Sequence, residues 1–209
     1  MKGKELSLSS ISMTNKSDKK DFVVLGFDPG SQVTGWGVIR NGSSPSMEGV
    51  GVIKPPSGES IEIRLEKIYS EAKKLIKKYK PDIVVVENPF VGKSASSALV
   101  LGQARGVILL AATRSGLEVA SYAPRAIKSS VAGNGNASKE QVQFMVQKLL
   151  YLKEAPTPLD ASDALAVAMC HIHRSKRTAT VDSKGPNISR LASNPKDIEA
   201  IMKWKKGKN

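Results

Sequence analysis

The sequence predicts an α/β fold in which a five-stranded mixed sheet is flanked by helices. The first part of the chain holds three β-like runs with short connections, which favours antiparallel neighbours. Two later apolar runs are separated by helical patterns, which favours parallel strands reached through helices. The length of 209 residues suits one domain with a sizeable core.

The three early strands are predicted at 22–28, 34–41 and 48–54. The first, FVVLGFD, is almost entirely apolar and therefore predicts a buried strand, and the glycine-rich turn PGSQVTG follows it. The second, TGWGVIRN, alternates in the manner of a strand, and the third reads EGVGVIK. Their short connections indicate an antiparallel meander at one side of the sheet.

A helix is predicted from about Ser60 to Tyr79, because apolar residues recur there on one stripe. Four lysines lie off that stripe and are interpreted as a solvated face, in preference to a DNA contact: Lys73, Lys74, Lys77 and Lys78. Pro81 ends the helix. The run at 82–87 is apolar throughout its middle and predicts a central, parallel strand.

The second half of the chain continues the alternation. A helix is expected over 94–113, with a face of small residues that allows close packing: Ala98, Gly102 and Gly106. A strand follows at 117–122, then helices over 124–131, 138–150 and 159–173. Ser138 and Gln141 form a capping-box signature. His171 and His173 are interpreted as residues near a helix C-terminus that point to different sides, rather than as metal ligands.

Four acidic residues stand beside apolar sequence, where solvated charges are not expected: Asp28, Glu87, Asp160 and Asp163. Two of them end predicted strands, and two lie three residues apart on one helix face. Sites in such sheets form at the carboxyl ends of parallel strands, so we expect the four to meet. Taken singly, Asp160 and Asp163 could instead serve as an N-cap and a favourable first-turn charge. Together they predict a Mg²⁺ site, because this ion takes carboxylate and phosphate oxygens.

The charge balance points to a polyanionic partner. The formal net charge is +13, and the ends carry most of it: +3 on residues 1–20 and +7 on 174–209. We expect both ends to be disordered extensions of a domain spanning 21–173, acting as solubility devices, as contacts to phosphate backbone, or as both. With one cysteine, Cys170, no intramolecular disulfide is possible. No uninterrupted apolar stretch reaches a membrane span and no secretory signal is recognisable, so a cytoplasmic protein is predicted.

Four stretches resemble the RuvC family of Holliday-junction resolvases, in family order. They read GFDPGSQVTGWGVI at 26–39, VVVENPF with ALVLGQARG within 84–106, YAPRAIKSSVAGNGNASKEQVQFMV at 122–146, and DASDALAVAMCH at 160–171. The resemblance implies a ribonuclease-H-like fold and a homodimer that nicks two opposed strands of a four-way junction. It also implies a role in DNA recombination and repair, with RuvA and RuvB, the branch-migration machinery, as partners.

Site residues follow from the same resemblance. It assigns catalysis and metal binding to the four acids, with Mg²⁺, or Mn²⁺ in its place, and two ions in each site. Phe90 matches an aromatic that stacks on a base near the cut, although packing on the next helix would also explain it. Lys128 and Lys139 match basic residues that contact DNA and the active site. Lys93 and Arg105 are further DNA-binding candidates in the matched region.

Three other functions remain open at this point. The opening GFDPGSQVTG also resembles the phosphate loop of actin-like sugar kinases, but the chain is short for their two lobes. A related nuclease acting on RNA–DNA hybrids or processing RNA would use the same acids. A junction-binding protein without catalysis would not need them, so the intact set of four disfavours that alternative.

Overall fold

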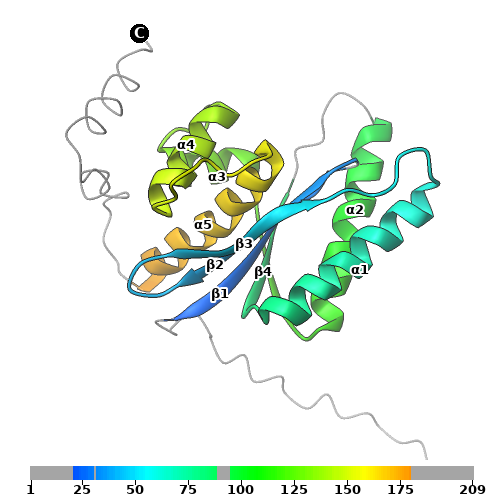
Figure 1. Cartoon of the computed structure of the whole chain (residues 1–209), viewed down its shortest axis with the longest axis horizontal. Coiled ribbons are helices and arrows are strands. Elements are labelled where there is room, and N and C mark those ends of the chain that lie inside the picture. Colours follow the sequence, from blue (N-terminus) through cyan, green and yellow to red (C-terminus); the bar gives the residue numbers. More distant parts are fainter. Residues whose placement is uncertain (1–20, 31, 89–94, 180–209) are drawn as a thin grey trace, which may run out of the picture.

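The computed structural model of the chain describes residues 21–30, 32–88 and 95–179. One mixed sheet runs through these residues, with strand order β3-β2-β1-β4-β5 (Figure 1). The strands are β1 (Phe22–Asp28), β2 (Thr34–Asn41), β3 (Ser46–Ile53), β4 (Ile83–Glu87) and β5 (Glu118–Tyr122). All five lie where the sequence predicts them, to within about two residues.

The pairing of the strands also agrees with the prediction. β1 and β2 are antiparallel, as are β2 and β3, whereas β4 runs parallel to both β1 and β5. The register between the second and third strands shifts at Val38 and Ile39. Because β1 and β4 are parallel neighbours, their carboxyl ends lie at the same edge of the sheet.

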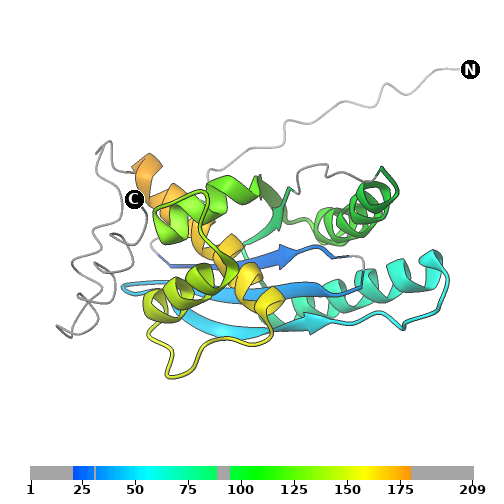
Figure 2. The same ribbon diagram turned by 90° about the horizontal axis from the view of Figure 1, so that it is seen from above.

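Helices cover both faces of this sheet. Figures 1 and 2 show α1 (Ile61–Tyr79) and α2 (Ala95–Arg114) on one face, and three helices on the other. These three are α3 (Pro124–Ala132), α4 (Lys139–Leu149) and α5 (Leu159–Ala179). The predicted capping box of α4 is present, since Ser138 and Gln141 satisfy each other's backbone N–H groups.

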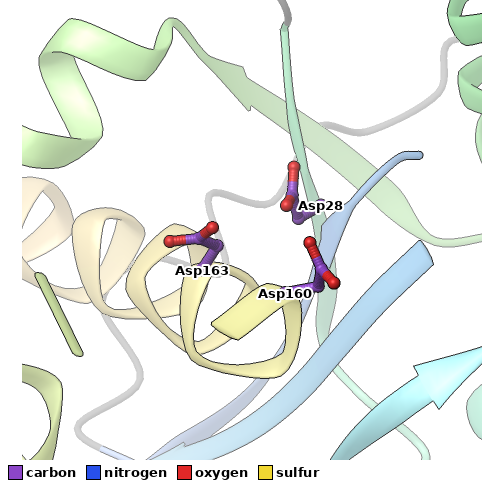
Figure 3. A group of neighbouring side chains, drawn as sticks. All are labelled: Asp28, Asp160 and Asp163. Carbon is purple, nitrogen blue, oxygen red and sulfur yellow. The ribbon is translucent and has the colours of Figure 1, made fainter. Parts of the chain in front are cut away.

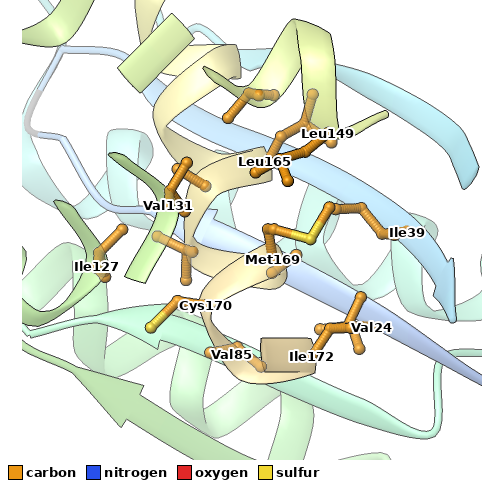
Figure 4. Close-up of a cluster of buried hydrophobic side chains, with 14 of the residues drawn as sticks. Val24, Ile39, Val85, Ile127, Val131, Leu149, Leu165, Met169, Cys170 and Ile172 are labelled. Carbon is orange, nitrogen blue, oxygen red and sulfur yellow. The ribbon is translucent and has the colours of Figure 1, made fainter. Parts of the chain in front are cut away.

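Each face has its own core. Side chains alternate along β1, so Val23, Leu25 and Phe27 pack under α1 and α2. Phe22 and Val24 pack on the opposite side, against α5. Figure 4 shows this second core, with side chains of α3 and α5 meeting those of the sheet. The same alternation points Asp28 towards the α5 face.

Glycines let α5 approach the sheet very closely. A Cβ atom at Gly35 would overlap the backbone carbonyl of Asp160, and one at Gly26 would overlap that of Ala164. At Gly37 the added carbon would meet the side chain of Leu165 at 2.7 Å. Only glycine fits at such crossings, because the helix backbone occupies the space of a side chain.

Two predictions about exposure and length can now be judged. The four lysines of α1 that were interpreted as a solvated face are exposed: Lys73, Lys74, Lys77 and Lys78. The expected end of α5 near His173 is wrong, because the helix continues to Ala179. The helix therefore includes the first six residues of the predicted extension at 174–209. The predicted disorder of residues 1–20 and 180–209 lies outside the described residues.

The α2 helix is unusually apolar for its position. Among the described residues it is the one helix long and apolar enough to cross a membrane, although length and composition alone are weak evidence for a span. One side of α2 is part of the core, through Ala104, Ile108, Ala111 and Ala112. Its small-residue face is open: Gly102 and Gly106 are exposed and have nothing within 4 Å of an added Cβ.

Candidate active site

Three aspartates converge at the carboxyl edge of the sheet. Figure 3 shows Asp28 at the end of β1 facing Asp160 and Asp163 on the first turns of α5. One carboxylate oxygen from each of them can be chosen so that all lie within 4.8 Å of one another. The spacing of three residues on α5 places both of its acids on the side that faces β1.

Glu87 completes the group from the neighbouring strand. Phe27 and Val86 are paired in the parallel register, so Asp28 and Glu87 follow them side by side. Val85 packs on the α5 face, and Glu87, two residues later, points to that same face. Asp28, Glu87 and Asp163 line one pocket of about 140 Å³, far above the roughly 10–15 Å³ that holds one water.

Three of the carboxylates, those of Asp28, Glu87 and Asp163, are hard to ionise in the absence of a cation. Burial, followed by the charges of Glu87 and Asp163, raises the pKa of Asp28 to about 8. Burial and the charge of Asp163 raise the pKa of Glu87 to about 7. Burial also raises the pKa of Asp163. Like charges packed in a partly dry pocket produce these shifts, and a bound cation would reverse them.

Lys139 supplies part of the missing positive charge. Its Nζ atom lies 2.9 Å from Asp163 Oδ2 and 3.9 Å from Asp160 Oδ1. The hydrogen bond to Asp163 raises the pKa of Lys139, so its charge is secured. Lys139 is the first residue of α4, where unpaired backbone N–H groups also favour a negative ligand.

This donor set fits a hard divalent cation. All the ligand atoms offered are carboxylate oxygens, which Mg²⁺ and Mn²⁺ prefer over softer metals. The pocket is bounded by one ammonium group at Lys139 and a second basic residue at Lys128. Two lysines cannot balance four ionised acids, so the excess negative charge favours binding of a cation.

The remaining predicted site residues are distributed differently. Lys128, on α3, lines the pocket together with Lys139. Arg105 does not line it. Arg105 instead donates from Nη2 to Ser121 Oγ at 2.9 Å, near the end of the outermost strand β5. Phe90 and Lys93 lie outside the described residues, so their predicted roles are not tested.

The pocket also has apolar walls that the sequence did not indicate. Pro124 and Ile127 of α3, Val142 of α4 and Ala166 of α5 complete its lining. Pro124 and Ile127 fall three residues apart at the start of α3, directly after β5. In the sequence, the one feature that could have indicated a place in the pocket wall is their position directly after a strand that ends beside Glu87.

The two histidines make separate contacts. His171 Nδ1 lies 2.9 Å from the hydroxyl of Tyr122, and His173 Nδ1 lies 3.1 Å from the carbonyl oxygen of Ser130. They point to different sides, as predicted, but α5 continues beyond them, so the expected position at the helix end is wrong. Among the described residues, the group suited to holding a metal ion is formed by the aspartates.

Comparison with known families decides the identity of the fold and site. The family model described as "Crossover junction endodeoxyribonuclease RuvC" matches residues 24–171. The chain belongs to the RuvC family. A RuvC from Dehalococcoides mccartyi (strain ATCC BAA-2266) is 47% identical over 163 residues, covering 78% of this chain and 98% of that relative. A RuvC from Pseudoalteromonas atlantica is 49% identical over 152 residues, covering 72% and 87%.

Solved structures agree with this assignment. Thermus thermophilus RuvC in complex with a Holliday junction substrate has a TM-score of 0.71 at 34% identity, covering 75% of this chain and 96% of that one. The yeast mitochondrial resolvase Ydc2, at 13% identity and a TM-score of 0.56, shares the fold. The predicted RuvC membership, fold class and enzyme class, a crossover junction endodeoxyribonuclease, are confirmed, and a sugar kinase is excluded.

Proposed function

We propose that this protein resolves four-way DNA junctions by hydrolysing one phosphodiester bond in each of two opposed strands. The observation that carries the proposal is the convergence of four carboxylates beside two lysines in a RuvC-family pocket. Asp28, Glu87, Asp160 and Asp163 act as the metal ligands and catalytic acids. The RuvC relatives whose names describe this activity match 78% and 72% of the chain.

The acids hold the cofactor in this proposal. Two Mg²⁺ ions, or Mn²⁺ ions in their place, occupy each site between β1, β4 and the start of α5. When bound, such ions stabilise negative charge on the transferred phosphate and lower the pKa of water. The protein's own contribution is to fix the acids in place: the strand ends are anchored in the sheet, and α5 is seated on glycines.

The basic residues of the pocket orient the substrate. Lys139 and Lys128 face the carboxylates across the pocket, so a phosphate entering there meets two positive charges and the N-terminus of α4. Both lysines also lower the pKa of Glu87, which favours its ionised form. Phe90, Lys93 and Arg105 are proposed DNA contacts around this pocket, with Phe90 stacking on a base near the cut.

Two symmetric nicks require two sites, and the protein is proposed to act as a homodimer. The exposed face of α2 is the proposed contact. Leu99 is 65% exposed and Leu110 is 49% exposed, although both are large apolar residues. Between them, Gly102 and Gly106 leave room for the backbone of a second helix. A second copy would cover this apolar strip.

Other aspects of the proposal rest on family membership. The protein is proposed to work in the cytoplasm, in recombination and repair. Its proposed partners are RuvA and RuvB, the branch-migration machinery.

The proposal is tested with four labelled substrates: four-way junction, linear duplex, RNA–DNA hybrid and single strand. We expect paired nicks in the junction alone, dependent on Mg²⁺ or Mn²⁺ and abolished by chelator. Preferred cleavage of the hybrid would favour the related RNA-processing nucleases instead.

A variant separates binding from catalysis. Asp28→Asn keeps the shape of the side chain but loses the charge that holds the ions, so it should bind the junction and fail to cut it. Asp21→Asn is the matched control, because Asp21 is an exposed aspartate whose ion pair is with Arg40, away from the pocket. Cleavage at wild-type rate by Asp28→Asn would refute the assignment.

A further inference from the structure

A band of positive charge extends from the pocket along α3 and α5. We call it the basic track and define it by four residues of these helices: Arg125, Lys128, Arg174 and Lys176. Lys128 lines the pocket, and the other three are exposed. No acidic residue occurs in α3, or in α5 after Asp163. The track therefore begins at the pocket with Lys128, and these stretches of its two helices contain no acid.

One contact brings the two halves of the track together. The side chain of His173 meets Ser130 twice: its Nδ1 atom is 3.1 Å from the Ser130 carbonyl oxygen and 3.3 Å from Oγ. Ser130 follows Lys128 by two residues, and Arg174 directly follows His173. The contact thus fixes α3 against α5 at a point close in sequence to Lys128 and Arg174.

Arg174 is held in place by an aromatic support. Its guanidinium carbon lies 5.0 Å from the centre of the Tyr122 ring, a cation–π geometry. The Tyr122 hydroxyl is in turn 2.9 Å from His171 Nδ1, and the His171 ring meets Phe22 edge-on. A long charged side chain on a fixed ring loses less conformational freedom when it binds a ligand than one extended into water.

The support is connected to the catalytic edge. Tyr122 is paired with Glu87 in the parallel register of β4 and β5, so the strand that carries the ring ends beside the site. Along α5, Arg174 follows Asp163 by eleven residues, which corresponds to roughly 16 Å at 1.5 Å per residue. On a DNA strand, which advances about 3.4 Å per nucleotide in a duplex, this is roughly five nucleotides from the cut.

From these observations we infer that the basic track binds the phosphodiester backbone of the DNA strand where it leaves the pocket, with Arg174 as a backbone contact. The inference rests on the proposed function and adds to it the path of the substrate across α3 and α5. Phosphate oxygens suit the basic track chemically, because the guanidinium groups of its arginines present several N–H donors to them. A solvated surface would explain scattered lysines, but not an exposed arginine seated on a hydrogen-bonded tyrosine.

Junction binding in chelator, measured over a range of salt concentrations, tests the inference. Arg174→Ala should reduce the log–log slope of affinity against salt by about 0.9, the value for one phosphate contact. Arg174→Lys should restore most of the slope, because the charge returns. Lys77→Ala is the matched control, since Lys77 is exposed on α1 across the sheet and its loss should leave the slope unchanged.

The outcomes separate this inference from the proposed function. An unchanged slope in Arg174→Ala, with wild-type junction cleavage intact, would overturn the track and leave the resolvase proposal standing. An equal loss in Lys77→Ala would show general attraction in place of a defined path, and would also overturn it. A wild-type protein that does not cut junctions would refute the resolvase proposal, whatever the slopes.

Discussion

Asp28→Asn should stabilise the metal-free protein at pH 8, although it removes a group proposed to be essential. The carboxyl of Asp28 has an ordinary pKa of 3.8, and burial beside Glu87 and Asp163 raises it to about 8 in the fold. Between these pH values the folded protein holds a proton that the unfolded chain has released. The free energy of unfolding must therefore fall as the pH rises through this range.

The size of the effect can be bounded from the same numbers. A difference of about 4 pKa units at roughly 1.36 kcal/mol per unit sets an upper limit near 6 kcal/mol at pH 8. Neighbouring groups share this energy, so we take about half of it as the expected effect. For a chain of this size, about 3 kcal/mol corresponds to a rise in Tm of roughly 6–12 °C.

Thermal unfolding in chelator at pH 5 and pH 8 measures the prediction. The Tm of Asp28→Asn should exceed that of wild type by a large margin at pH 8. The margin should be smaller at pH 5, where the wild-type carboxyl stays protonated. Adding Mg²⁺ should raise the Tm of wild type more than that of the variant, because ligand binding stabilises the folded state. Asp21→Asn should show no such gain. If Asp28→Asn were no more stable than wild type at pH 8, the electrostatic reasoning would be refuted.

Three further predictions concern the site, the packing and the dimer. Lys139→Met should shift the rising limb of the pH–rate profile for cleavage upward by about one unit or more, because a charge that favours ionised acids is lost; an unshifted profile contradicts this. Gly35→Ala should destabilise the protein by about 1–3 kcal/mol in denaturant unfolding, owing to the overlap beneath α5. At the control position Gly42, an added Cβ would have its nearest neighbour 3.9 Å away, so Gly42→Ala should leave the stability close to that of wild type. Replacing Leu99 and Leu110 together by Asp should halve the mass seen by light scattering; a monomeric wild type would make the proposed contact wrong.

Much of the fold could be predicted from the sequence, because its signals are local. Alternation and apolar runs located all five strands, and Pro81 and the Ser138 capping box marked helix boundaries. The end of α5 could not be placed. The polar composition after His173 resembles a tail, yet contacts between distant residues hold the helix there, including that of Arg174 with Tyr122. Such contacts leave no periodic pattern in the sequence.

The acids of the site were predictable and their surroundings were not. Asp28 and Glu87 end strands, and this position alone brought them to one edge. The apolar pocket walls at Ile127 and Val142 could not be distinguished in advance from ordinary core residues. Arg105, a predicted DNA contact, donates a hydrogen bond to Ser121 and is not part of the pocket lining.

The order in which the chain is made bears on when it becomes able to cut DNA. Asp28 is synthesised early, whereas Asp160 and Asp163 belong to α5, the last described helix. At roughly 5–20 residues per second, the ribosome needs about 7–26 s to pass from Asp28 to Asp160. Until α5 emerges, the glycine-bearing face of the sheet is uncovered and half of the carboxylates do not exist. A product that terminates before α5 therefore lacks both a closed core and a complete nuclease site.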